Sequence, residues 1–270
     1  MGRHSSTRRL QVLRWLDNIG DGRFFLVIAT PLLALYLATA TWGAPFTTDP
    51  YSNVLSAWTL GTQRTFFMED HEQLADPDYY RNVAWVIPAG DSAANKYPPG
   101  ATLLAAPLYA VWPAEARLVT VSGAGRPDVA PVEILNPSLA PAAITVSLAV
   151  AAAMGLLGVA FRRLGGTAGA AIAAAFVAGL GTSTWSVAAD QLWQHGPGML
   201  WIALAVVLSE RQALGSGLAL GAAILTRPPT AVIAAAMGLY RAWHERNLRI
   251  AILIGAGATA GLGLLVAYNQ

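Results

Sequence analysis

Seven apolar segments joined by short connections constrain the fold of this chain more than any other feature. A straight helix needs about 20 apolar residues to cross a bilayer, and most of the segments approach that length. Only 12% of the 270 residues are charged, roughly half the usual fraction in soluble proteins. The sequence therefore predicts an all-α integral membrane protein with about seven transmembrane helices, at 24–43, 139–161, 167–188, 192–209, 214–226, 229–241 and 250–268.

The fifth and sixth segments are short, and one alternative joins them into a single helix through "LTRPPT". That helix would carry Arg227, Pro228 and Pro229 at its centre. A charge would then lie in the bilayer, and two prolines would interrupt the backbone hydrogen bonds. Two short helices that meet at a polar surface are the better interpretation.

The arginines predict the orientation of the spans. Short loops rich in arginine and lysine remain in the cytoplasm. The tail and the connections after the second, fourth and sixth spans carry eleven cations, whereas the opposite short connections carry only Arg227. We therefore expect a multi-pass protein of the plasma (inner) membrane with a cytoplasmic N-terminus. The eleven are Arg3, Arg8, Arg9, Arg14, Arg23, Arg162, Arg163, Arg211, Arg241, Arg246 and Arg249.

The first span has a second interpretation. Residues 24–37 resemble the core of a signal peptide, and "ATA" at 38–40 resembles a cleavage site. The basic region before it is long for a signal peptide, and further spans follow. N-terminal sequencing of the purified protein distinguishes cleavage at Ala40 from an intact first helix.

These features divide the chain into four parts. Residues 1–23 form a basic cytoplasmic tail that suits anionic lipids rather than nucleic acid. The first helix (24–43) leads into a long extracytoplasmic loop (44–137), and a six-helix bundle (138–270) follows. The chain contains no cysteine, which excludes disulfides and thiolate chemistry.

The long loop contains ten of the fifteen acidic residues and two candidate interfacial helices. Residues 51–67 place Val54, Leu55, Trp58 and Leu60 on one apolar stripe, which is typical of a helix lying on the membrane surface. Residues 101–112 are apolar but too short to span readily, so we expect a second helix along the interface.

Lys96, the only lysine, precedes that second helix in "NKYPPG". Pro99 suits the entry of a helix, where its missing N–H costs nothing. A lysine beside the amide groups of a helix N-terminus can hold an anion, most plausibly a phosphate.

Asp49 follows the first span in "FTTDPYS". An Asp followed by Pro is typical of an N-cap for a helix that begins at Pro50. A carboxylate at this depth can also act as a catalytic base near the outer headgroups.

The order of these motifs resembles a known family. "FTTDPYS", "NKYPPGATLLAAPLYAV", "DQLWQHGP" and "LTRPPTA" are similar in order and sidedness to motifs of the polytopic type-C glycosyltransferases, which use polyprenyl-phosphate sugars. The branch with protein mannosyltransferases and lipid A aminoarabinose transferases is the most similar. The resemblance implies that Asp49 is the catalytic base and that Lys96 and Arg227 bind the donor phosphate.

The implied reaction moves a sugar from the lipid phosphate to an acceptor hydroxyl on a glycan, lipid or protein, with inversion. A phosphate leaves as a stable anion, so one base suffices, unlike the two carboxylates of glycoside hydrolysis. No cofactor is required. Tyr97, Asp190 and His195 are further candidate substrate contacts, although aromatic anchoring and helix entry also explain such residues.

The chain also departs from this family. Pro50 replaces the second acidic residue that often accompanies the first-loop Asp, and the sequence stops at "VAYNQ" where relatives continue. The alternative is therefore a non-catalytic protein, or a fragment, that binds lipid-linked sugars or assists assembly. A transporter fits less well, because intramembrane charges are nearly absent. Glu69, Asp70 and His71 in "FMEDHE" are candidate ligands for a divalent metal, although such runs are also common in solvated loops.

Overall fold

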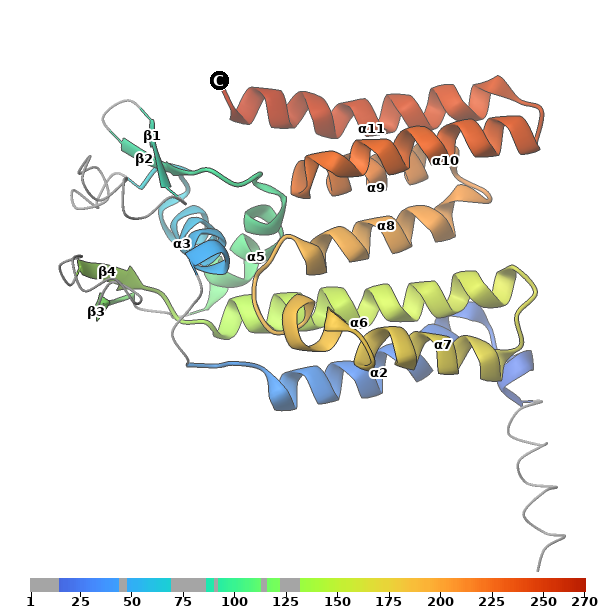
Figure 1. Cartoon of the computed structure of the whole chain (residues 1–270), viewed down its shortest axis with the longest axis horizontal. Helices are drawn as coiled ribbons and strands as arrows, with labels where there is room; N and C mark the ends of the chain where they lie inside the picture. The colour runs from blue at the N-terminus through green and yellow to red at the C-terminus, as the bar shows by residue number, and fades with distance from the viewer. Residues whose placement is uncertain (1–14, 44–47, 69–85, 90–91, 113–115, 122–131) are drawn as a thin grey trace, which may run out of the picture.

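Helices dominate the structure, a computed structural model that describes residues 15–43, 48–68, 86–89, 92–112, 116–121 and 132–270. Seven helices among these residues run side by side as an elongated bundle (Figure 1). Successive helices run in opposite directions, so their connections alternate between the two ends. They are α2 (Asp21–Thr39), α6 (Ala140–Arg163), α7 (Ala168–Leu180), α8 (His195–Ser209), α9 (Ala213–Thr226), α10 (Ala231–His244) and α11 (Leu248–Tyr268).

Three of these helices are long and apolar enough to cross a membrane, namely α2, α6 and α11, with 19, 24 and 21 residues. The other four are shorter, at 13 to 15 residues, and α7, α8 and α9 among them are apolar. A π-helical turn, η2 (Thr184–Ala188), follows α7. The apolar helices support a membrane-associated protein. The seven predicted segments are helical, but seven membrane spans are not shown, because only three of these helices have spanning length.

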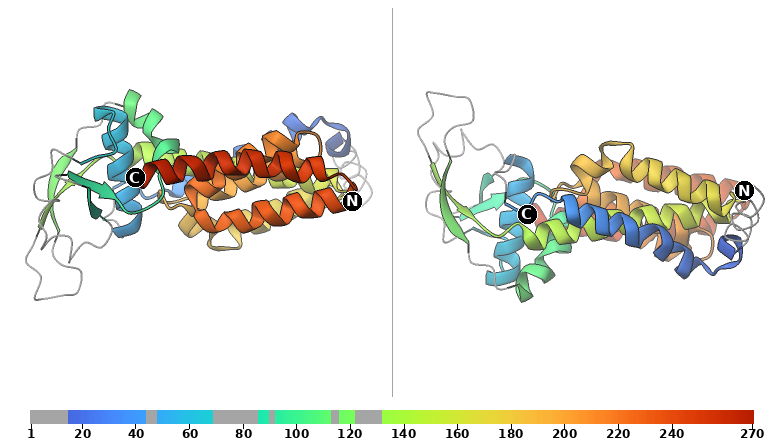
Figure 2. Two further views of the ribbon diagram at one scale, coloured as in Figure 1. Left: turned by 90° about the horizontal axis from the view of Figure 1, so that it is seen from above. Right: turned by 90° about the horizontal axis from the view of Figure 1, so that it is seen from below.

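The remaining described elements gather at one end of the bundle, as both views of Figure 2 show. We call them the cap. It comprises α3 (Thr48–Gln63), α5 (Gly100–Val111) and two antiparallel hairpins, β1 (Val86–Ala89) with β2 (Ser92–Asn95) and β3 (Arg117–Val121) with β4 (Val132–Asn136). Sequence reasoning missed both hairpins. Their only signal was short β-branched stretches such as "RLVTV" and "VEILN".

The expectation that α3 lies on the membrane surface is wrong for its apolar stripe. Val54 and Leu55 are 1% and 0% exposed, and Val54 belongs to a cluster with residues of α5 and α6. Gly61 permits this packing, because a Cβ there would lie 2.6 Å from the carbonyl oxygen of Ala106. Part of the stripe is thus buried against α5, a neighbour that sequence periodicity does not reveal.

The opposite end of the bundle carries the expected cations. Arg162 and Arg163 both pair with Asp21 at the start of α2, with Arg163 Nη2 2.8 Å from the carboxylate. The guanidinium of Arg162 also lies 4.2 Å from the centre of the Phe24 ring. Arg241 pairs with Glu245 one turn later at this same end. The arginines that the sequence predicts on one side of the membrane therefore gather at one end of the bundle.

The structure confirms that residues 214–241 form two helices. Helix α9 ends at Thr226, a single 3-10 turn, η3 (Pro228–Thr230), follows, and α10 begins at Ala231. Thr230 closes the break by donating from its N and Oγ1 to the carbonyl oxygen of Arg227, at 2.9 and 2.8 Å. Arg227 therefore lies outside both helices, at the cap end.

Small residues let α9 and α11 approach until their backbones touch. Gly217 and Gly221 of α9 face Gly257 and Gly261 of α11, each pair spaced by four residues. A Cβ on Gly261 would collide with the backbone of Gly221, and one on Gly257 would lie 2.5 Å from the carbonyl carbon of Gly217. Such spacing is the usual device for close helix packing in lipid, and it holds the end of α9 in position.

Candidate functional site

A cavity of about 150 Å³ lies where the cap meets the bundle. Three distant segments line this cavity. Arg227 comes from the end of α9, His195 from the start of α8, and Tyr97 from the loop between β2 and α5. These three were expected to contact the substrate, although they are far apart in the sequence. The full lining is Asn53, Tyr97, Trp193, Gln194, His195 and Arg227.

Arg227 and His195 form the polar centre of this cavity. Arg227 Nη1 donates to His195 Nδ1 at 3.0 Å. A guanidinium has only donors, so Nδ1 must be the acceptor and the proton of the neutral ring lies on Nε2. The pair thus directs one cation and one N–H donor toward a ligand.

Lys96 lies at the rim of the cavity and not in its wall. Its side chain is exposed, and Nζ lies 5.0 Å from the centre of the Tyr97 ring. This is a cation–π distance. Tyr97 itself lines the cavity, so a ligand that enters past this ring passes close to the lysine.

Two buried asparagines hold the Lys96 loop in place, and sequence reasoning missed both. Asn95 Nδ2 donates to Asn53 Oδ1 at 3.1 Å, and Asn53 Nδ2 donates to the Leu192 carbonyl at 2.9 Å. Asn95 Oδ1 accepts from the Tyr97 amide at 3.0 Å, while its carbonyl accepts from Tyr268 Oη at 3.1 Å. Both asparagines are only 2% exposed. Their only sequence signal was proximity to Asp49 and Lys96.

Helix α5 begins as predicted, with Pro99 at its N-cap. Its first residue packs against the end of α9, because a Cβ on Gly100 would lie 2.6 Å from the Thr226 amide nitrogen. The positive end of one helix thus abuts the negative end of the other. Among the described residues, the cavity lining includes Tyr97 but none from α5.

Asp49 is the second residue of α3, which begins at Thr48 and not at Pro50. It therefore lies in the first turn of the helix. The Asp49 side chain lies outside the described part of the chain. Asn53, four residues later, lines the cavity. The cavity therefore lies about one helical turn beyond position 49 along α3.

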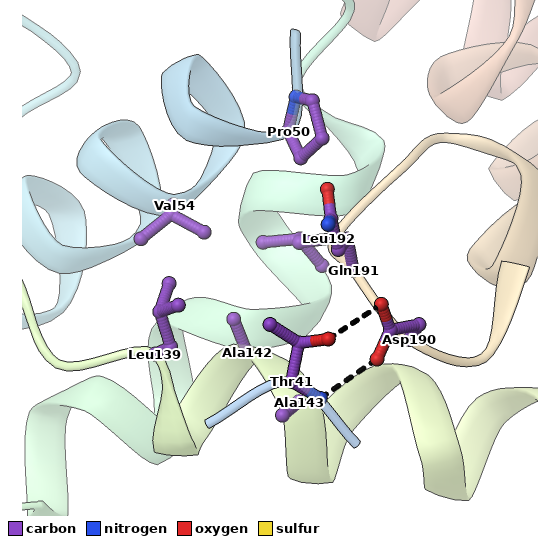
Figure 3. A pocket seen from close by; sticks show the side chains of 9 residues that line it. All are labelled: Thr41, Pro50, Val54, Leu139, Ala142, Ala143, Asp190, Gln191 and Leu192. Atoms are coloured by element: carbon purple, nitrogen blue, oxygen red, sulfur yellow. Dashed lines mark hydrogen bonds between the residues drawn. The ribbon is translucent and has the colours of Figure 1, made fainter. Parts of the chain in front are cut away.

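Asp190 has a structural partner. Its two carboxylate oxygens accept from the amide and the hydroxyl of Thr41, at 2.7 and 2.9 Å (Figure 3). The cavity beside it holds only about 10 Å³ and is also lined by Pro50, which is room for about one water molecule. Asp190 therefore connects the end of α2 to the α7–α8 loop. It does not line the cavity that contains Arg227 and His195.

A second, larger cavity of about 310 Å³ adjoins the first one. It lies between η2, the start of α8, and the turn into α10. Its wall is largely apolar, with contributions from Val187, Met199, Ile202 and Ile233. Gln194, His195 and Arg227 line both cavities.

The expected metal ligands Glu69, Asp70 and His71 lie outside the described residues. Within the described ranges, no three His, Cys, Asp or Glu side chains group closely enough to hold a metal ion.

Comparisons with known proteins do not supply a family. No family model matches this chain, and neither a curated protein nor a solved structure matches it significantly. The fold and the cavity define it only as a helical, membrane-associated protein with a cationic cavity under a cap.

Proposed function

We propose that this protein is a membrane glycosyltransferase that moves a sugar from a polyprenyl-phosphate donor to an acceptor hydroxyl. The observation that carries the proposal is the convergence of Tyr97, His195 and Arg227 on one cavity, with Lys96 at its rim. The helix that carries Asp49 also contributes Asn53 to this wall. The family resemblance in the sequence assigns Lys96 and Arg227 to donor binding and Asp49 to catalysis.

Each residue has one task in the proposed reaction. Asp49 accepts the proton of the acceptor hydroxyl as its oxygen bonds to the anomeric carbon. The bond from that carbon to the phosphate oxygen breaks, and the configuration inverts. Arg227, oriented by His195, and Lys96 offset the charge that grows on the leaving phosphate. A phosphate leaves as an anion, so no second carboxylate is required.

The proposed topology has all seven bundle helices crossing the membrane, with the cap outside and the N-terminus in the cytoplasm. Helices α8, α9 and α10 would extend only about 20 Å at 1.5 Å per residue. Their shortness is compatible with this topology because the cavities and the cap lie at their outer ends (Figure 1). A site recessed in the outer leaflet lies close to a lipid phosphate.

Single cysteines test this topology cleanly, since the chain has none of its own. We expect Lys96→Cys to react with a membrane-impermeant maleimide in intact cells and Arg246→Cys to react only after permeabilisation. Both positions are exposed, so access to the reagent and not burial decides the result. If Arg246→Cys is labelled in intact cells and Lys96→Cys is not, the protein has the opposite orientation in the membrane.

Donor binding and transfer test the function. Purified protein is incubated with radiolabelled polyprenyl-phosphate mannose and membrane acceptors. We expect Arg227→Gln and Lys96→Ala to weaken donor binding and turnover by at least about tenfold, because each removes a charge-assisted contact. Lys96→Arg should recover only part of the activity, because the planar guanidinium of arginine presents its donors in a different geometry from the compact ammonium of lysine.

Two results contradict the proposal. Binding without transfer by the wild-type protein would identify a lipid-linked sugar-binding or assembly protein instead. Full activity in both Arg227→Gln and Lys96→Ala, at matched folded-protein concentration, would remove the cavity from the reaction.

A further inference from the structure

The two cavities meet at a neck formed by Gln194, His195 and Arg227, the residues that line both of them. Gln194 is the last residue before α8, and His195 is the first residue of that helix. Arg227 follows the end of α9. The neck therefore sits between the smaller polar cavity and the larger, largely apolar one.

Each neck residue carries an N–H donor that is not hydrogen-bonded to another described residue. Gln194 Nε2 is buried and hydrogen-bonds to no atom in the part of the chain that the structure describes. His195 carries its proton on Nε2, because Nδ1 accepts from Arg227. The Arg227 guanidinium has donors beyond the one that this bond uses. A cluster of donors with one fixed positive charge suits an anionic group with several acceptor oxygens.

A buried amide donor without a partner is costly unless a ligand completes it. The sequence provides a comparison within the same loop. Gln191 also has a buried polar atom, Oε1, without a partner among the described residues, but it lines the small cavity beside Asp190. Of these two glutamines, only Gln194 combines a donor without a described partner with a neighbouring cation in a cavity large enough for a ligand.

We propose that Gln194 is a phosphate-binding residue that donates its amide N–H to a phosphate oxygen held at the neck beside Arg227. The inference rests on the proposed function for the source of this phosphate, a single-chain lipid phosphate. The hydrocarbon chain would enter the apolar cavity lined by Met199 and Ile202, and the polar part would enter the cavity beneath Tyr97. Arg227 alone would hold an anion, whereas Gln194 adds a directional contact at the junction.

Farnesyl phosphate, farnesol and inorganic phosphate serve as probes in calorimetric titrations of the full chain in detergent micelles. We expect Gln194→Met, similar in length but without a donor, to weaken farnesyl phosphate binding by about tenfold. Gln194→Glu has nearly the same shape but presents a negative oxygen, so the loss should be larger, about 100-fold. Gln191→Met is the matched control and should bind as the wild type does. Size-exclusion chromatography and circular dichroism verify the fold of each variant.

The probes separate the possible outcomes. Wild-type affinity in Gln194→Met overturns the inference and leaves the proposed function in place. Absence of farnesyl phosphate binding by the wild type overturns both. Equal binding of farnesol and farnesyl phosphate also overturns the inference, because the phosphate would then contribute nothing. Equal binding of inorganic phosphate, weakened in Gln194→Met, supports the residue assignment and identifies free phosphate as the ligand.

Discussion

Replacing Asp49 with asparagine should lower sugar transfer by at least about 100-fold, the scale expected for the loss of a general base. Asparagine retains the size and much of the helix-start preference of aspartate but cannot accept the proton. Because α3 begins at Thr48, Asp49 lies in the first turn, where its charge adds only about 0.3–1 kcal/mol of stability. The measurement is donor turnover at matched folded-protein concentration, beside a thermal unfolding curve.

Two further variants sharpen this prediction. Asp49→Glu should also be poor, because the base must reach one oxygen within hydrogen-bond distance. Asp21→Asn is the control, since it removes a carboxylate that pairs with Arg162 and Arg163 at the opposite end of the bundle. It should lower stability and leave turnover per folded molecule unchanged. Wild-type turnover in Asp49→Asn would reduce Asp49 to a helix-start residue.

Replacing Gly261 with alanine should destabilise the fold more than any other single-methyl change on α11. The added Cβ would meet the backbone of Gly221, so two helices must separate and no flexible side chain can absorb the strain. Overpacking a core typically costs about 1–3 kcal/mol, and a backbone clash places the expected loss at about 3 kcal/mol or more. The midpoint of thermal unfolding in detergent reports this loss directly.

Gly263→Ala is the matched control for that experiment. It lies two residues further along α11, and a Cβ there meets nothing within 4 Å. Alanine also favours a helix over glycine by up to about 1 kcal/mol, so this variant should be neutral or slightly stabilised. Equal unfolding midpoints for the two variants would contradict the close packing of α9 on α11.

Local sequence patterns predicted the helical segments of the bundle. Hydrophobic runs of sufficient length report directly on burial or lipid contact, because this property belongs to each segment alone. Arg227-Pro228-Pro229 predicted the break between α9 and α10 for a similarly local reason. The arginine pattern also predicted that Arg162, Arg163 and Arg241 gather at one end.

The cap was less predictable, because its stability comes from contacts between distant segments. The apolar stripe with Val54 and Leu55 looks the same in the sequence whether lipid or α5 covers it. The hairpins between 86 and 136 depend on pairing across turns, which strand propensity alone indicates weakly. Asn53 and Asn95, 42 residues apart, became informative only when their hydrogen bond was seen.

For the candidate site, the sequence by itself singled out most of the residues to which we assign the proposed chemistry. A single lysine, the one arginine in the short connections at the cap end and a histidine at a helix entry stand out because charges are scarce in this chain. Only the tertiary structure decided how they combine. It brought His195 to Arg227, left Lys96 at the rim, tied Asp190 to Thr41, and placed Gln194 at the neck. Chemical type is a property of one residue, whereas hydrogen-bond geometry and burial depend on helices packing from distant parts of the chain.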